Sequence, residues 1–432
     1  MELGDALEWL DAHQNLERML SDRGAAVPDP ARMRRLVHVL GDPQSALPVL
    51  HVTGTNGKTS TARALTQLLM AKGLSVGTFT SPHLERINER ICANGEAIGD
   101  DDLADALSGV ASVEALLEVR PTWFEILAAA AFRTFADLPV DAAVVEVGIG
   151  GRWDATNVVD ATVAVVTNVG LDHGEFLGPT RADVAAEKAG IVKPGSTLVL
   201  GETDPELYPI FERESPAQLW WAGRDYAVES NELAVGGRLL DLRTPKGHYD
   251  EVFLGLNGRH QGSNFADAVV GAEAFFGAPI EPDLVVAAAS AVRSPGRLEV
   301  VGRRPLVVLD GAKNLEGART AAAALDDFGP VASRILVVGM LAGKDAAEML
   351  EALDGARARL VVACPPPSPR AQPSAVVAAA AAGLGSATAE AESVSEALEI
   401  ALAAAGVDDL ILVTGSLYVV GAARTVLAGR LR

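Results

Sequence analysis

The chain has 432 residues and a formal net charge of −21, and 49% of its residues are hydrophobic and 22% charged. This length suits two domains, and this composition supports a large buried core and not disorder. The acidic balance argues against broad nucleic-acid binding, which requires a basic surface. An anionic small substrate remains compatible with it, provided that a few placed cations and a metal ion meet that substrate.

The sequence predicts neither a targeting segment nor a membrane span. The N-terminus is acidic and lacks the basic and apolar pattern of a signal peptide, and no apolar stretch approaches the length of a bilayer-spanning helix. Cys92 and Cys364 are the two cysteines, which is too few for a disulfide framework or a cysteine-based zinc site. We therefore expect a reduced, cytoplasmic protein.

Residues 1–46 are predicted to be helical, with helices over 6–19 and 31–40 joined by a Gly/Pro segment. Arg32, Arg34 and Arg35 lie in the second of these helices. Arginines on a helix surface are usually solvated, and facing an anionic substrate is the alternative.

The stretch from Leu50 to Ser60 predicts a phosphate-binding loop. An apolar run over 47–52 indicates a short buried strand, and residues 61–72 carry apolar side chains at helical spacing. Between them stands Gly-Thr-Asn-Gly-Lys, a shorter form than the eight-residue consensus. The loop N–H groups and the helix N-terminus would face phosphate oxygens, and Lys58 would neutralise them. The alternative, a turn with a chance lysine, is disfavoured by the flanking strand and helix.

The next two strands of the predicted parallel sheet also end in polar residues. A strand over 74–80 places Ser81 beside the nucleotide, with a simple turn as an equal alternative. The apolar strand over 140–147 carries Glu146 near its end. Burying an unpaired carboxylate costs several kcal/mol, so this one requires a cation. We favour Mg²⁺, with an ion pair to Arg152 as the alternative.

A third strand, over 161–167, is followed by His173, and a helix over 180–190 carries Lys188. A lone histidine is more often structural than a ligand, and helical spacing alone favours a surface position for Lys188. Several strands that end in polar residues are nevertheless typical of an open α/β sheet whose ligand lies across the carboxyl ends.

Residues 197–256 alternate short apolar runs with turns, which predicts a small β-rich insertion without visible chemistry. Gln261 and Asn264 follow it, just before an Ala-rich helix. Their amide groups suit a base or a ribose, and capping of the helix is the equal alternative.

The segment 293–297 is the best candidate for a domain boundary, and it divides residues 1–294 from residues 295–432. Beyond it, strands and helices alternate again, which predicts a second α/β domain. Its predicted elements are strands over 305–309, 334–338, 360–363 and 410–413, a helix over 315–328, and helix, strand and helix within 375–405. Asp310 and Ser416 follow two of these strands, so we expect a cleft between the domains that closes over the reactants.

The sequence resembles folylpolyglutamate synthase and bifunctional dihydrofolate synthase, members of the Mur-ligase superfamily of ATP-dependent amide-forming ligases. The matching motifs cover the chain end to end in the family's order, and the ordered set is specific. They are His-Val-Thr-Gly-Thr-Asn-Gly-Lys (51–58), Thr-Ser-Pro-His-Leu (80–84), Glu-Val-Gly-Ile-Gly-Gly-Arg-Trp-Asp-Ala-Thr-Asn (146–157), Asp-His (172–173), Glu-Lys-Ala-Gly-Ile (187–191), Pro-Gly-Arg-Leu-Glu (295–299), Leu-Asp-Gly-Ala (309–312) and Gly-Ser-Leu-Tyr (415–418).

The resemblance implies an N-terminal P-loop domain with a parallel sheet and pterin-binding loops. It also implies a smaller, Rossmann-like C-terminal domain that closes over ATP and binds the amino acid. The implied ATP contacts are Gly54, Thr55, Asn56, Gly57, Lys58, Thr59, Ser60, Gln261, Asn264, Arg297 and Asp310. Of the two loop hydroxyls, the family pattern favours Ser60 as the phosphate or metal contact.

The resemblance also implies two Mg²⁺ ions and a carbamylated lysine. The implied metal site consists of Ser81, Glu146, His173 and carbamylated Lys188. The implied substrate contacts are Pro82 and His83 on the pterin side and Ser416 for the incoming glutamate. The charges that would support catalysis come from Lys58, Lys188, Arg297 and Lys313.

The implied reaction transfers the γ-phosphate of ATP to a folate or dihydropteroate carboxylate, and L-glutamate then attacks the acyl phosphate. Such chemistry depends on positioning and charge neutralisation, and needs no side-chain nucleophile. Thr59 replaces a family glycine, and Lys313 replaces a family histidine. The second change motivates two alternatives: a ligase for a different acid or amine, or an ATP-binding homologue without ligase activity. Family members are often monomeric, so we expect a monomer.

Overall fold

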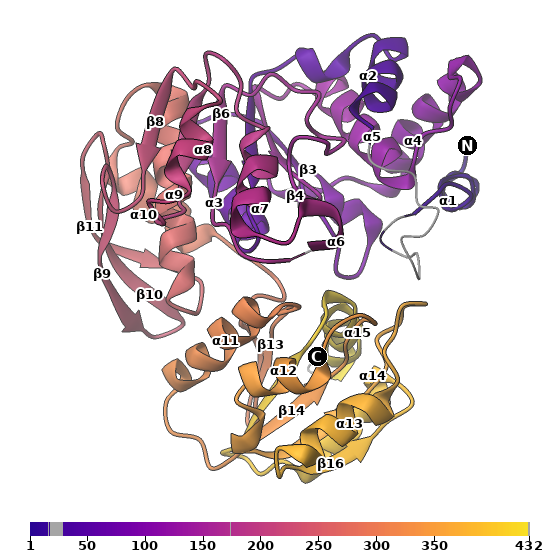
Figure 1. Ribbon diagram of the computed structural model, residues 1–432, viewed down its shortest axis with the longest axis vertical. Coiled ribbons are helices and arrows are strands. Elements are labelled where there is room, and N and C mark those ends of the chain that lie inside the picture. The colour runs from indigo at the N-terminus through magenta and orange to yellow at the C-terminus, as the bar shows by residue number, and fades with distance from the viewer. Residues whose placement is uncertain (16, 18–28, 173, 431–432) are drawn as a thin grey trace.

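The computed structural model describes residues 1–15, 17, 29–172 and 174–430. Within these residues, strands form an eight-stranded, a three-stranded and a six-stranded sheet. The eight-stranded sheet with its helices, together with the three-stranded sheet, is called the N-terminal lobe below. The six-stranded sheet with its helices is the C-terminal lobe, which lies beneath the first in Figure 1.

The eight-stranded sheet has the order β4-β3-β2-β5-β1-β6-β7-β8, and all pairs are parallel except those of β3 with β2 and β4. Its strands are β1 (Val49–Thr53), β2 (Val76–Phe79), β3 (Ile91–Ala93), β4 (Glu96–Ala97), β5 (Ala142–Glu146), β6 (Val163–Val166), β7 (Thr197–Leu200) and β8 (Gln218–Trp221). The central strands are apolar and buried on both faces, as expected for a parallel sheet covered by helices. Because β1 lies between β5 and β6, the loops after these three strands meet at one edge.

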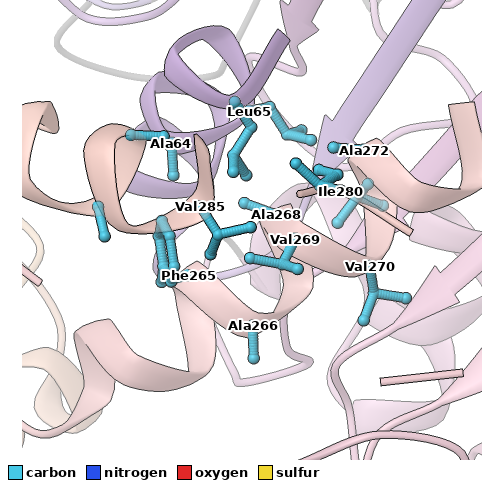
Figure 2. Packing of buried hydrophobic residues seen from close by; sticks show 14 of the residues in the cluster. Ala64, Leu65, Phe265, Ala266, Ala268, Val269, Val270, Ala272, Ile280 and Val285 are labelled. Carbon is cyan, nitrogen blue, oxygen red and sulfur yellow. The ribbon is translucent and has the colours of Figure 1, made fainter. Parts of the chain in front are cut away.

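Helices cover both faces of this sheet. On one face lie α3 (Lys58–Ala71), α9 (His260–Phe276) and α10 (Pro282–Ala291). Figure 2 shows Leu65, Phe265 and Val285 packed together in the core between these helices. The other helices of this lobe are α1 (Leu3–Asp11), α2 (Pro30–Val39), α4 (Asp100–Val113), α5 (Trp123–Asp137), α6 (Gly174–Leu177), α7 (Arg181–Ala189) and α8 (Tyr208–Glu212).

The three-stranded sheet consists of β9 (Ala227–Ala234), β10 (Gly237–Arg243) and β11 (His248–Leu254), all antiparallel. Its buried residues join the same core as α9. The prediction of one β-rich insertion over 197–256 was wrong in its first half, because β7 and β8 extend the eight-stranded sheet in parallel. The apolar residues of β7 and β8 are buried by helices and by β6. The alternation of apolar runs and turns in the sequence does not show which sheet these strands join.

The six-stranded sheet has the order β12-β13-β17-β14-β15-β16, in which β12 alone is antiparallel to its neighbour. Its strands are β12 (Glu299–Arg303), β13 (Leu306–Leu309), β14 (Arg334–Val338), β15 (Ala358–Ala363), β16 (Ala387–Glu390) and β17 (Leu410–Thr414). Its helices are α11 (Leu315–Ala324), α12 (Ala346–Ala352) and α13 (Ser374–Gly383) on one face, and α14 (Val394–Ala404) and α15 (Leu417–Arg430) on the other. The helix, strand and helix predicted within 375–405 are confirmed.

The first predicted helix was too long, because α1 ends at Asp11 and the chain turns over residues 12–15. The backbone N–H of Trp123 donates to the Gln14 carbonyl, and the indole of Trp123 donates to Asp11. These two contacts tie the turn to the start of α5. Residues 16, 18 and 19 of the prediction lie outside the described residues. Nowhere in the described part of the chain is a helix long and apolar enough to cross a bilayer.

Candidate active site

The loop between β1 and α3 has the backbone of a phosphate-binding loop. Gly57 has a φ of +85°, and a Cβ at this position would lie 2.3 Å from Oδ1 of Asn264. A Cβ on Gly54 would lie 1.8 Å from Oγ1 of Thr167. Only glycine therefore fits at either position, and the loop is packed against β6 and α9.

Lys58 is the first residue of α3 and folds back over its own loop. Its Nζ donates to the Gly54 carbonyl at 2.9 Å and to the Thr55 carbonyl at 3.4 Å. Burial lowers the pKa of Lys58 to about 8, although the nearby Glu146 opposes the shift. The lysine is thus held at the mouth of the loop, where phosphate oxygens compete well for its protons.

Glu146 ends β5 beside this loop, and its carboxylate is buried. Thr59 Oγ1 donates to both of its oxygens, at 2.9 and 3.0 Å, and the Ser81 N–H donates to Oε2 at 3.1 Å. Burial raises the pKa of Glu146, and Lys58 opposes this effect. Arg152 instead donates to the Ala186 carbonyl and pairs with a different glutamate, so the ion pair considered for Glu146 does not form.

The loop hydroxyl that meets Glu146 is that of Thr59, whereas the family pattern favours Ser60. Ser60 is buried, and its hydroxyl bonds the Ser294 hydroxyl at 3.0 Å. Residue 60 lies one position further along α3, about 100° around the helix from Thr59. This rotation turns its side chain away from β5.

Lys188 is buried on α7, only 2% exposed, so the surface position favoured by helical spacing was wrong. A Cβ on Gly151 would lie 3.1 Å from the Lys188 Cα, so the glycine-rich loop after β5 covers α7 closely. Burial, reinforced by Lys58, lowers the pKa of Lys188 well below its ordinary value, and Asp172 opposes this shift. The sequence pattern of α7 alone does not show that the loop after β5 covers the Lys188 side of the helix, and this explains why the predicted surface position was wrong.

The described residues contain no cluster of three or more His, Cys, Asp or Glu side chains that is arranged to hold a metal ion. His173, one of the predicted ligands, lies outside the described residues. Mg²⁺ in phosphoryl-transfer sites is usually held by one or two carboxylates together with phosphates and waters. The carboxylate of Glu146 beside Thr59 and Ser81 fits this pattern.

On the C-terminal lobe, Asp310 follows β13 and is held by two backbone N–H groups. Its Oδ2 accepts from Leu298 at 3.0 Å and its Oδ1 from Ala312 at 2.9 Å. Burial raises the pKa of Asp310, and Arg297 opposes the shift. Arg297 also donates to the Gly311 carbonyl at 3.3 Å, and its charge acts on Lys58 across the lobes.

The other predicted nucleotide contacts lie in the first turns of α9. Gln261 and Asn264 are both buried, and the Asn264 amide donates to Gln261 Oε1 at 3.0 Å. The residue before the helix makes no side-chain cap, so these amides do not cap α9. The contact of Asn264 with Gly57 places this pair directly on the phosphate loop.

The predicted substrate residues lie at two other points of the site. His83 Nδ1 accepts from Nε of Arg90 at 2.9 Å, and Arg90 stacks over the Trp123 ring. Pro82, just before His83, belongs to the same loop after β2. Ser416 is buried at the start of α15, where its Oγ accepts from the Val419 N–H. Within the part of the chain that the structure describes, no hydrogen bond joins the Ser416 side chain to Lys58 or Glu146.

The two lobes meet through polar contacts that sequence analysis missed. The Asp172 carboxylate forms ion pairs with Nζ of Lys344 at 3.1 Å and Nζ of Lys313 at 3.7 Å. It also accepts a hydrogen bond from Nδ2 of Asn314 at 3.2 Å. The same amide of Asn314 also donates to Asn56 in the phosphate loop. Lys344 follows β14, so the rule that polar residues after parallel strands line the site would have found it.

Two Mur ligase family models match this chain. The model of the Mur ligase middle domain matches residues 52–272. The model of the glutamate ligase domain matches residues 296–417. The chain belongs to the Mur ligase family. The phosphate loop and the loops after β5 and β6 all fall in the middle domain, and Asp310 falls in the glutamate ligase domain.

Within the Mur ligase family, the chain is similar to folate enzymes. A Mycobacterium tuberculosis dihydrofolate synthase/folylpolyglutamate synthase is 38% identical over 351 residues, which are 76% of this chain and 72% of that protein. A Lacticaseibacillus casei folylpolyglutamate synthase is 35% identical over 420 residues, or 94% of this chain and 96% of that protein. The chain is thus a folylpolyglutamate synthase/dihydrofolate synthase-type Mur ligase, an ATP-dependent glutamate ligase.

Solved Mur ligases share the fold over nearly the whole chain. The M. tuberculosis folylpolyglutamate synthase complexed with ADP and AMPPCP has a TM-score of 0.90 at 35% identity, covering 99% of this chain and 98% of that one. An Escherichia coli enzyme in complex with DHPP and ADP has a TM-score of 0.88 at 29% identity, again covering 99% and 98%. The α/β architecture expected from the sequence is therefore confirmed.

Proposed function

We propose that this ligase joins the amino group of L-glutamate to a dihydropteroate or folate carboxylate, with ATP converted to ADP and phosphate. The observation that carries the proposal is the meeting of Lys58, Glu146 and Lys188 at one edge of the parallel sheet, opposite Asp310 and Arg297 of the C-terminal lobe. The family comparison supplies glutamate as the amine and folates as the acids.

Phosphoryl transfer comes first. A carboxylate oxygen of the folate attacks the γ-phosphorus of ATP, the bond to the β-γ bridging oxygen breaks, and ADP leaves. Lys58 and the N–H groups of the loop hold the phosphates, and Arg297 adds positive charge from the opposite lobe. Catalysis of this kind rests on positioning and charge neutralisation, and the site offers both.

Amide formation follows. The amine of L-glutamate attacks the acyl carbon, the carbon–oxygen bond to phosphate breaks, and the amine loses a proton. We place the amino acid near Lys313, Lys344 and Ser416 on the C-terminal lobe. The two lysines pair with Asp172, and the carboxylates of glutamate would compete with Asp172 for them.

Two Mg²⁺ ions are part of the proposal. Glu146 and Ser81 would hold one, with His173, and a carbamate on Lys188 would help to hold the second. When bound, Mg²⁺ neutralises the developing charge on the phosphates. Carbamylation requires a neutral amine, and burial of Lys188, which lowers its pKa, favours the neutral form. We further propose that residues 1–294 and 295–432 act as the two domains that close on ATP, and that the protein is a monomer.

The first experiment is to measure phosphate release by the purified protein with ATP, Mg²⁺ and L-glutamate. Dihydropteroate and tetrahydrofolate are supplied in separate reactions. Release with both acceptors identifies a bifunctional enzyme, and release with one shows which step it performs. Release with neither, from protein that still binds ADP, would refute the proposal and favour a different acid or amine, for which Lys313 is the specific motive.

A further inference from the structure

Arg238 is a buried arginine far from the phosphate loop in sequence, on strand β10 of the three-stranded sheet. It is 5% exposed, and within the described residues its donors bond two residues, Asn231 and Asp327. Nε donates to Asn231 Oδ1 at 2.7 Å, and Nη2 donates to the Asn231 carbonyl at 2.7 Å. Nη1 donates to Oδ2 of Asp327 at 3.0 Å. Because Asp327 belongs to the C-terminal lobe, this guanidinium joins the two lobes.

Asn231, on β9, passes this connection to α9. Its Nδ2 donates at 2.8 Å to the carbonyl of Arg259, the residue before that helix. A Cβ on Gly262 would lie 2.4 Å from the same Nδ2, so the amide lies against the first turn of α9. This turn carries Gln261, and Asn264 follows on the next.

On the other side, Asp327 lies in a 3₁₀ turn, η4 (Leu325–Phe328), that directly continues α11. At the opposite end of α11, the N-cap residue Asn314 donates its amide to Asn56 of the phosphate loop at 3.1 Å. The segment from Asn314 to the end of η4 therefore contacts the N-terminal lobe near both of its ends. A segment with one such contact could rotate relative to the N-terminal lobe, whereas contacts near both ends fix its orientation.

We propose that Arg238 is a positioning residue for ATP binding: through Asn231 and Asp327 it fixes the C-terminal lobe relative to the nucleotide-contact turn of α9. The inference rests on the proposed function of Gln261, Asn264, Arg297 and Asp310 as nucleotide contacts. The three-stranded sheet thus links the C-terminal lobe to α9 through Arg238 and Asn231. Without this link, a smaller fraction of molecules presents both halves of the ATP site together, and the apparent affinity for nucleotide falls in proportion to that fraction.

The test uses the full-length variants Arg238→Met and Asp327→Ala. Both should raise the KM for ATP and the Kd for ADP about fivefold, the size expected for loss of the Arg238–Asp327 ion pair, which the two variants have in common, at a partly exposed interface. The value of kcat at saturating ATP should stay within about twofold of wild type, because bound ATP restores the lobe orientation. The split between KM and kcat separates positioning from a loss of folded protein.

Arg243→Met is the matched control. Arg243 lies on the same strand, pairs with Glu229 of β9 at 3.2 Å and donates to the Asp225 carbonyl. Among the described residues, none of its hydrogen bonds or ion pairs reaches the C-terminal lobe. Its variant should leave both constants for nucleotide unchanged. An equal rise in KM for Arg243→Met, or unchanged nucleotide affinity in Arg238→Met and Asp327→Ala, would overturn the proposal.

Two outcomes separate this inference from the proposed function. If Arg238→Met does not fold, Asp327→Ala decides, because the Asp327 side chain is about one-third exposed and its truncation disturbs the core less than the loss of a buried arginine. ADP affinity is measured by calorimetry, independently of any acceptor. Wild-type protein that binds ADP but does not use folates would refute the proposed substrates. The Kd for ADP of the two variants, compared with wild type, would still decide the role of Arg238. Wild-type protein that does not bind ADP would overturn both.

Discussion

The hydroxyl of Thr59 donates to both carboxylate oxygens of Glu146, at 2.9 and 3.0 Å. One hydroxyl has one proton, so this is a bifurcated contact that holds the carboxylate symmetrically beside the phosphate loop. In other loops of this kind, a hydroxyl at the start of the helix binds Mg²⁺. On this geometry we expect Thr59 to fill the role that the family pattern suggests for Ser60.

Thr59→Val is expected to lower kcat/KM by about tenfold or more, because a lost hydrogen bond to a charged group costs about 1.5–3 kcal/mol. The KM for Mg²⁺ should rise in parallel. Ser60→Ala, which removes the hydroxyl bond to Ser294, is the matched control and should change kcat/KM by less than about threefold. The reverse order of effects would return the role to Ser60.

Lys58→Ala should abolish ATP turnover while the protein stays folded, as checked by circular dichroism. The hydrogen bonds of Lys58 within the described residues go to carbonyl groups of its own loop, at 2.9 and 3.4 Å, so its loss should leave the packing of α3 on the sheet intact. Wild-type turnover in the folded variant would contradict the phosphate-loop assignment.

The pH dependence of the free enzyme reports on the same lysine. Burial lowers the pKa of Lys58 to about 8, so the side chain is cationic below that pH and neutral above it. The value of kcat/KM for ATP should therefore fall as pH rises through about 8, approaching tenfold per pH unit. Lys58→Arg keeps its charge in this range and should lack the decline, at a lower activity. A flat wild-type profile up to pH 10 would contradict the prediction.

Much of this fold could be predicted from the sequence, and the reason is local. The run from Val49 to Thr53 is apolar and buried on both faces, and the turn after it contains glycines that no other residue can replace. A parallel sheet brings the ends of its strands to one edge, so Glu146 and Ser81 were correctly expected near the loop.

Other features depend on packing that no single segment reveals. Lys188 lies on a helix whose pattern suits a surface, yet the loop after β5 covers it. The contacts of Asp172 with Lys344 and of Arg238 with Asp327 join segments far apart in sequence. Each requires the orientation of one lobe on the other, which local propensities do not encode. The predicted length of the first helix was wrong for the same reason, because contacts with α5 hold the turn that ends α1.

Lys188→Ala should lose most of its activity, because it removes the amine that would be carbamylated. Added short carboxylic acids such as acetate or propionate should restore part of it, since their carboxylate can occupy the place of the carbamate. For wild type, removal of dissolved CO₂ should lower activity and bicarbonate should restore it. Lys72→Ala, which breaks an exposed pair with Glu281, is the control and should respond to neither treatment. Full activity of Lys188→Ala without added acid would rule out the carbamate.

The last prediction concerns Lys313, which stands where the family has histidine. Its Nζ lies 3.7 Å from Asp172 and its side chain is 45% exposed, so it can reach a ligand beside Asp172. An ammonium group offers positive charge and no acceptor, which suits charge neutralisation. Lys313→Met should therefore raise the KM for L-glutamate by about tenfold, as for the loss of one charged hydrogen bond, and leave the KM for ATP within about twofold.

Lys313→His should show an intermediate KM for L-glutamate that decreases below about pH 6.5, where imidazole becomes cationic. Steady-state kinetics with L-glutamate varied at fixed ATP measure both. An unchanged KM for L-glutamate in Lys313→Met would place the amino acid elsewhere, and Lys344→Met would then be the variant to compare, because Lys344 holds the other oxygen of Asp172 at 3.1 Å.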